Sequence, residues 1–168
     1  MQLSQAGLEF IKHAEGFRSH TYLDGAGLPT IGYGHRLLAH EDFPQGINEN
    51  EAERLLIHDL QVSLQAIERM VKVPLTQGQF DALVDFTFNL GEERLARSTL
   101  LRALNGGRYQ AAGEQLLRWD LIDGKESNGL RQRRITELAL WNLPAPQPPA
   151  PEPAPAPVPE PKNGTQAA

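Results

Sequence analysis

The chain has 168 residues, a formal net charge of -5 and no cysteine. A chain of this length is expected to form one folded domain with a hydrophobic core. The acidic balance argues against a nucleic-acid-binding protein, because binding to phosphates requires a basic surface. Without cysteine the fold can have neither a disulfide framework nor a thiolate metal site, so we expect side-chain packing to hold it together.

The first part of the chain predicts a helix, a hairpin and a long helix. Apolar residues at helical spacing predict a helix over 4–14. Aromatic and β-branched residues flank the turn sequence DGAGLP within 17–35, and this pattern predicts a small antiparallel hairpin, the only convincing β region. Asn48 and Glu51 then form a capping-box pattern, which predicts the start of a long helix that ends before Pro74.

The second part of the chain predicts helices only. Thr76 and Gln79 form another capping pattern, before a helix that we expect to end at Gly91. In the last predicted helix, Ile135 and Leu138 are expected on the buried face. The shorter helices are predicted at 98–104, 109–119 and 130–141.

This order of elements predicts an α+β fold with two lobes. We expect a small N-terminal lobe with a β-hairpin or short antiparallel sheet, a long connecting helix and a helical C-terminal lobe. Because ligand sites are usually concave, the cleft between the lobes is the expected functional site.

The composition changes abruptly after Trp141. Ten of the chain's 13 prolines lie between Pro144 and Pro161, where they alternate mainly with Ala, Glu, Gln and Val. Such a sequence favours an extended polyproline conformation over a helix or a sheet. We therefore predict a folded domain over 1–143 and a disordered Pro/Ala-rich tail over 144–168, which is either simply solvated or serves as a tether or a ligand for a proline-binding module.

Three polar residues, Glu15, Asp24 and Thr30, frame the glycine-rich hairpin. Cleavage of a glycosidic bond takes an acid that protonates the leaving oxygen and a base or nucleophile that acts at the anomeric carbon. Glu15 falls at the end of the first helix, where the helix dipole and a partly dry cleft are expected to raise its pKa. Asp24 enters a solvated turn, where it stays charged, and Thr30 can hold a water that Asp24 polarises. The competing interpretation makes Asp24 a turn former and Thr30 an ordinary strand residue.

The run from Glu15 to His35, EGFRSHTYLDGAGLPTIGYGH, resembles the signature of the bacteriophage lysozymes of glycoside hydrolase family 24. The resemblance covers about residues 3–142. It continues through EAERLLIHDL at 51–60, QFDALVDFTFNLG at 79–91, STLLRALN at 98–105 and GLRQRRITELALW at 129–141.

The resemblance implies the two-lobed muramidase fold and a function as an endolysin. The implied substrate is the peptidoglycan glycan strand, cut by hydrolysis at the β-1,4 bond from N-acetylmuramic acid to N-acetylglucosamine. It further implies that Glu15, Asp24 and Thr30 are the catalytic residues of an inverting acid–base mechanism without a metal or cofactor.

Two other residues near the hairpin, His35 and Tyr33, are also candidates for a role at the site. His35 has no metal-ligand spacing to the other histidines, so no metal site is predicted. The resemblance instead implies a structural pair between His35 and Asp59 of the long helix. Tyr33 is a candidate for contact with the substrate.

A group of three arginines near the C-terminal end of the folded part has two possible roles. In one interpretation, one of the arginines lies across the cleft near Glu15, where its charge would oppose the rise in the pKa of Glu15. In the other, all three form a solvated face. The group comprises Arg131, Arg133 and Arg134.

Other functions remain open from the sequence. A lytic transglycosylase on the same scaffold would use one glutamate and form an anhydro product, and Asp24 argues against it. A non-catalytic peptidoglycan-binding or particle-associated module would not need all three polar residues. A proline-rich adaptor would bind its partners through the tail alone.

The sequence shows neither a signal peptide nor a stretch long enough to span a membrane. By family analogy we expect a monomer that does not insert into membranes and accumulates in the host cytoplasm. It would then reach the periplasmic cell wall with the help of a holin.

Overall fold

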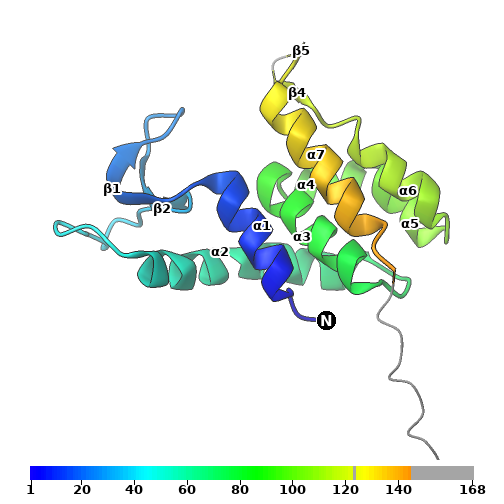
Figure 1. Ribbon diagram of the computed structural model, residues 1–168, viewed down its shortest axis with the longest axis horizontal. Helices are drawn as coiled ribbons and strands as arrows, with labels where there is room; N and C mark the ends of the chain where they lie inside the picture. Colours follow the sequence, from blue (N-terminus) through cyan, green and yellow to red (C-terminus); the bar gives the residue numbers. More distant parts are fainter. Residues whose placement is uncertain (123, 145–168) are drawn as a thin grey trace, which may run out of the picture.

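The computed structural model describes residues 1–122 and 124–144, so most of the predicted tail lies outside the described residues. Within this part of the chain the fold is α+β, with seven helices and two small antiparallel sheets. A small lobe with a three-stranded sheet and a larger helical lobe are connected by the long helix α2 (Figure 1). The predicted fold class is therefore confirmed.

The N-terminal lobe combines one helix with a sheet. Ser4 caps the first helix, since its side chain accepts a hydrogen bond from the Gly7 amide at 3.0 Å. The sheet has the order β1-β2-β3, so the predicted hairpin gains a third strand. Thr30 of the middle strand is in register with Tyr22 on one side and Arg36 on the other. The elements are α1 (Gln5–Glu15), β1 (Arg18–Leu23), β2 (Pro29–Gly32) and β3 (His35–Arg36).

The connection between the lobes is α2 (Glu49–Met70), whose 22 residues span roughly 33 Å. The predicted capping box is present, because Asn48 accepts from the Glu51 amide and the Glu51 side chain accepts from the Asn48 amide. One face of the helix is buried through residues such as Leu56 and Leu60. Elements of both lobes pack against α2.

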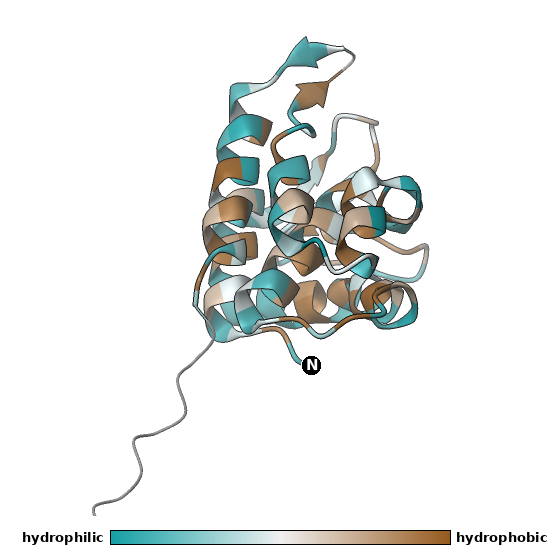
Figure 2. Ribbon diagram, turned by 90° about the vertical axis from the view of Figure 1, so that its right-hand side faces the viewer, coloured by the Kyte–Doolittle hydropathy of each residue, from teal (hydrophilic) through white to brown (hydrophobic). Residues whose placement is uncertain are grey.

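The C-terminal lobe is a group of helices arranged around α3, which is buried along most of its length. Thr76 and Gln79 form the predicted capping box of α3, and α7 packs along the same helix. Hydrophobic and hydrophilic residues alternate along the helices of this lobe (Figure 2). The elements are α3 (Gln77–Leu90), α4 (Glu92–Arg97), α5 (Thr99–Asn105), α6 (Tyr109–Leu116), β4 (Leu121–Ile122), β5 (Lys125–Glu126) and α7 (Asn128–Trp141).

Four details of the lobe differ from the sequence predictions. The short helix α4 and the β4–β5 hairpin were not predicted, because each has too few residues for a periodic pattern. The helix predicted over 109–119 ends at Leu116. Ile135 was expected on the buried face of the last helix, but it is exposed, and the buried residues of α7 are Arg134, Glu137 and Trp141. Charged residues therefore occupy the inner face of α7.

None of the described helices combines the length and the apolar character needed to cross a lipid bilayer.

Candidate active site

Glu15 is the last residue of α1, and its carboxyl meets both lobes. One oxygen, Oε1, accepts a hydrogen bond from Arg133 Nη2 of α7 at 2.8 Å. The other oxygen faces the turn between β2 and β3, since a Cβ placed on Gly34 would lie 3.7 Å from Oε2. The carboxyl remains partly exposed, with 23% of the side-chain surface accessible. Of the three arginines considered from the sequence, Arg133 is thus the one that reaches Glu15.

Asp24 follows β1 and is held by the turn that it begins. Its Oδ1 accepts hydrogen bonds from the amides of Ala26 at 2.8 Å and Leu28 at 2.9 Å, and Oδ2 lies 3.2 Å from Arg36 Nε. The Leu28 amide, followed by the Ala26 amide and the Arg36 guanidinium, holds the pKa of Asp24 below its usual value. This carboxyl is therefore charged at neutral pH.

Thr30 lies in β2 and is buried, with 2% of its surface exposed. Its hydroxyl donates a hydrogen bond to the carbonyl of Leu28 at 3.0 Å. Because the proton is engaged in this way, the oxygen of Thr30 retains lone pairs that can accept a hydrogen bond from another group.

The three predicted catalytic residues each approach the same short segment, the β2–β3 turn and β3. Glu15 faces Gly34 in the β2–β3 turn, and Asp24 contacts Arg36 of β3. Thr30 is the strand partner of Arg36. Gly34 adopts a φ of +88°, which glycine tolerates without strain.

Arg133 is anchored by a residue that sequence reasoning missed. Its Nε and Nη2 donate to the two oxygens of Asp85 on α3, at 2.9 and 2.6 Å. Asp85 is fully buried and Arg133 nearly so. Burial alone would lower the pKa of Arg133, but Asp85 and Glu15 together raise it. No local sequence signal links α3 to α7, because the two partners are 48 positions apart.

His35 is buried between two carboxylates. Its Nδ1 lies 2.8 Å from Asp59 Oδ2 on α2, and Nε2 lies 3.0 Å from Glu41 Oε2. Burial lowers the pKa of His35, but the hydrogen bonds and charges of Glu41 and Asp59 outweigh burial and raise it. Sequence reasoning named Asp59 and missed Glu41, which lies in a loop without a recognisable motif.

Tyr33 is 5% exposed and packs within the N-terminal lobe. Its ring centroid lies 5.6 Å from that of Phe17 and 5.8 Å from the Lys12 ammonium. The ring is therefore surrounded by protein on these sides, and its role as a substrate contact stays a prediction.

The described residues include no group of three or more His, Asp or Glu side chains placed to hold a metal ion.

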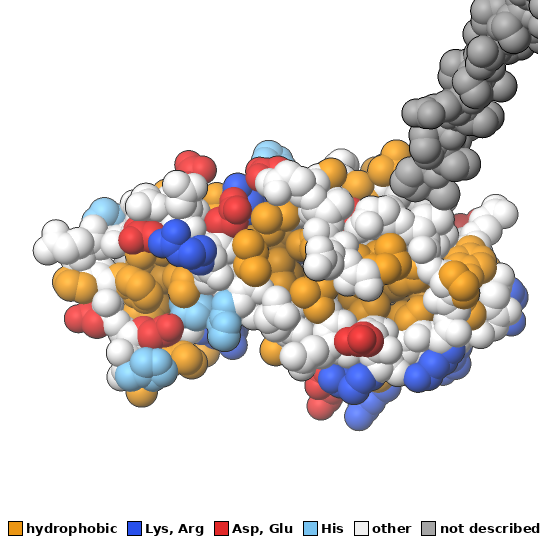
Figure 3. Space-filling model, turned by 90° about the horizontal axis from the view of Figure 1, so that it is seen from below, with side chains coloured by type: hydrophobic (Ala, Val, Ile, Leu, Met, Phe, Trp, Pro, Cys, Tyr) orange, Lys and Arg blue, Asp and Glu red, His pale blue; other side chains and the backbone are white. Residues whose placement is uncertain are grey.

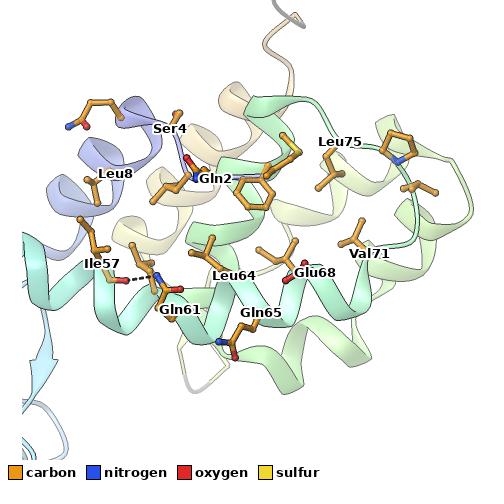
Figure 4. Close-up of a pocket in the computed structure, with 18 of the residues that line it drawn as sticks. Gln2, Ser4, Leu8, Ile57, Gln61, Leu64, Gln65, Glu68, Val71 and Leu75 are labelled. Atoms are coloured by element: carbon orange, nitrogen blue, oxygen red, sulfur yellow. Dashed lines mark hydrogen bonds between the residues drawn. The ribbon is translucent and has the colours of Figure 1, made fainter.

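A separate groove lies between α1, α2 and the loop before α3, and it has a volume of about 890 Å³. Hydrophobic side chains gather on this face of the molecule (Figure 3). Leu8, Ile57, Leu64, Val71 and Leu75 line it (Figure 4). None of the three predicted catalytic residues lines this groove.

Comparison of the sequence with known families identifies the phage lysozyme family, whose profile matches residues 12–137. An endolysin of Bacillus phage B103 is 42% identical over 144 residues, which cover 84% of this chain and 54% of that protein. This chain thus spans about half the length of that relative. An endolysin of Salmonella phage P22 is 41% identical over 144 residues, which cover 84% of this chain and 98% of the P22 protein.

Solved structures show the same similarity. The endolysin from Escherichia coli O157:H7 phage FAHEc1 superposes with a TM-score of 0.78 at 36% identity, covering 88% of this chain and 98% of that one. The muramidase domain of SpmX from Asticaccaulis excentricus gives a TM-score of 0.78 at 37% identity, covering 85% and 99%.

Proposed function

This chain belongs to the phage lysozyme family, and from that premise we propose that it is an endolysin that hydrolyses bacterial peptidoglycan. The bond cleaved is the β-1,4 linkage between N-acetylmuramic acid and N-acetylglucosamine. The observation that carries the proposal is the approach of two carboxyls, Glu15 and Asp24, to the same segment of β-sheet. Their surroundings differ, since Glu15 pairs with one guanidinium and Asp24 accepts two backbone amide hydrogen bonds.

In the proposed mechanism Glu15 is the general acid and protonates the leaving oxygen of the sugar. Asp24 is the general base that removes a proton from the attacking water, and its lowered pKa keeps it ionised for this task. Thr30 accepts a hydrogen bond from that water, because its own proton is engaged by Leu28. The water attacks the face of the sugar opposite the leaving group, so the product is inverted at the anomeric carbon.

The test of the catalytic assignment is Glu15→Gln. We expect loss of peptidoglycan hydrolysis, because an amide cannot donate the required proton. The Tm should stay within a few degrees of the wild-type value, since the amide oxygen can still accept from Arg133. The matched control is Glu9→Gln on an exposed part of the same helix, which should retain activity. Retained cleavage by Glu15→Gln would refute the assignment.

Product analysis separates the alternative functions. Peptidoglycan digested in ¹⁸O-labelled water should yield muropeptides that carry the label at a new reducing end. An anhydro product without the label would indicate a lytic transglycosylase. Binding without any release of fragments would indicate a non-catalytic module.

The route to the substrate is a finer part of the proposal. An endolysin made in the host cytoplasm must cross the inner membrane to reach the periplasmic wall, and we propose a holin as the partner that opens it. Expression in Escherichia coli with and without a holin should give lysis only with the holin. Lysis by this chain alone would contradict holin dependence, and sedimentation analysis would test the proposed monomer.

The domain boundary is also part of the proposal. We propose that residues 1–143 form the lysozyme domain and that 144–168 is a tail dispensable for cleavage. A chain ending at 143 should keep its Tm and its activity on peptidoglycan.

A further inference from the structure

A third acidic residue, Glu137, lies behind the contact between Arg133 and Asp85. It is on α7 and is fully buried. Neither of its oxygens accepts a hydrogen bond from the described residues, and the neighbouring Asp85 carboxyl helps to raise the pKa of Glu137. This arrangement needs an explanation, because a buried ionised carboxylate normally collects several donors.

Glu137 forms a salt bridge with Arg134, but this contact supplies no hydrogen bond to either carboxyl oxygen. Arg134 Nη2 lies 2.8 Å from Glu137 Oε1, but the contact lacks the geometry of a hydrogen bond. The same nitrogen donates instead to Asn89 Oδ1 at 2.8 Å. Two further nitrogens of Arg134 have no partner among the described residues. The guanidinium therefore makes a charge contact with Glu137 but donates no hydrogen bond to it.

Two guanidiniums, those of Arg133 and Arg134, belong to the same buried cluster. Burial lowers the pKa of Arg134, but a guanidinium stays protonated in proteins.

Glu137 is the carboxyl for which ionisation costs most. It is fully buried and accepts no hydrogen bond within the described part of the chain, whereas Asp85 accepts two from Arg133 and Glu15 is partly exposed to solvent. Burial, followed by the contact with Asp85, raises the pKa of Glu137 well above its usual value, while the two guanidiniums oppose that rise. The helix α6 also packs on α7, and the residue that it places against Trp141 is Gly113, which carries no charge.

We infer that Glu137 is a positioning residue for the Glu15 site: it keeps its proton, donates it in a hydrogen bond to Asp85, and so fixes Asp85 in the orientation that presents Arg133 to Glu15. Asp85 uses both oxygens to accept from Arg133, and a carboxylate oxygen can accept a second hydrogen bond. This inference rests on the proposed function, because it concerns the surroundings of the proposed general acid.

The first test measures protonation through stability. Glu137→Gln keeps a donor but cannot ionise, and Glu93→Gln on exposed α4 is the matched control. A carboxyl whose pKa is raised by folding contributes stability that is fully present below its unfolded pKa and is lost as pH rises toward the folded pKa.

The Tm of Glu137→Gln should therefore exceed that of the wild type by a margin that grows with pH between 5 and 9, while Glu93→Gln follows the wild type. A Glu137→Gln protein that is less stable by a constant amount over this range would show an ionised Glu137 and overturn the inference.

The second test measures positioning through activity. Glu137→Gln should retain kcat, whereas Glu137→Met, which lacks a donor, should lower kcat by roughly tenfold or more with little change in KM, because misplacing a group by about 1 Å can cost about 100-fold. Equal loss in both variants, or loss in neither, would overturn the positioning role.

These tests separate the inference from the proposed function. If the wild-type chain does not cleave peptidoglycan, the proposed function fails, and the Tm comparison still decides whether Glu137 is protonated. If the Glu137 variants do not fold, the infrared spectrum of the wild-type protein at pH 7 provides the answer. A band from a protonated, water-shielded carboxyl supports the inference, and its absence overturns it.

Discussion

Removal of the Arg133 guanidinium is the most direct test of how the two lobes are connected at the site. Arg133 donates to both oxygens of Asp85 and to one oxygen of Glu15, over distances of 2.6 to 2.9 Å. Asp85 is fully buried, so Arg133→Gln would leave its carboxylate without the charged partner to which it is hydrogen-bonded. Removing one partner of a buried ion pair typically costs about 3–5 kcal/mol. We expect a loss of that size in the free energy of unfolding.

The matched control is Arg131→Gln on the same helix. Arg131 is mostly exposed, and its nearest carboxylate, Glu126 Oε2, lies 3.9 Å away. Exposed pairs of this kind contribute about 0–1 kcal/mol. Because about 2–4 °C of Tm corresponds to 1 kcal/mol in a protein of this size, Arg133→Gln should lower the Tm by roughly 6–20 °C and Arg131→Gln by a few degrees at most.

Urea unfolding at pH 7 measures both changes, and a double variant tests their origin. Asp85→Asn combined with Arg133→Gln removes the unpaired charge, so the double variant should be more stable than the sum of the single losses indicates. If Arg133→Gln costs no more than Arg131→Gln, Asp85 is solvated or neutral in solution, and the account of this contact is wrong.

Two further predictions concern packing and pH. A Cβ at Gly78, the second residue of α3, would lie 2.0 Å from the Leu140 carbonyl oxygen, so Gly78→Ala should cost about 1–3 kcal/mol in thermal unfolding. A Cβ at Gly129, the second residue of α7, would meet only Ser127 Oγ at an ordinary contact distance of 3.9 Å. Gly129→Ala should therefore stabilise by about 0.5–1 kcal/mol; equal effects would refute the steric argument. His35 has a raised pKa in the folded state, so its stabilising contribution is present below about pH 6.5 and is lost as pH rises through the folded pKa. His35→Asn should abolish this decline in Tm, and an unchanged pH dependence would contradict the charged pairing.

Much of the fold could be predicted because its signals are local. The capping boxes at Asn48 and Thr76 each lie within four residues, and both helices begin where these patterns place them. The hairpin that carries Asp24 and Thr30 follows from a turn sequence between strand-forming residues. The fold class follows from such signals taken in order.

The wrong placement of Ile135 in α7 has a physical cause. The pattern of apolar residues assigned Ile135 to the buried face, but the buried positions include Arg134 and Glu137. Hydrophobic periodicity assumes that buried residues are apolar, and this assumption fails where charges are buried in pairs. The buried face of α7 is determined by its packing against α3, which carries Asp85, and this contact leaves no pattern in the sequence of α7.

The candidate site also has one part that the sequence predicts and another that it does not. Glu15, Asp24 and Thr30 lie within 16 consecutive residues and could be named from the sequence. The groups that control them come from distant segments, since Arg133 is 118 positions from Glu15. A single sequence contains no signal for such a contact.

Burying the charged groups at the junction of α3 and α7 costs desolvation free energy, and this cost needs an explanation. Apolar residues of similar volume often match or exceed the stability of buried ion pairs, so stability alone does not explain them. They lie directly behind the contact between Arg133 and Glu15. A guanidinium held by a buried carboxylate has few alternative orientations, and the carboxyl of Glu15 is restrained with it. The arrangement is therefore explained by the orientation it gives to the proposed proton donor.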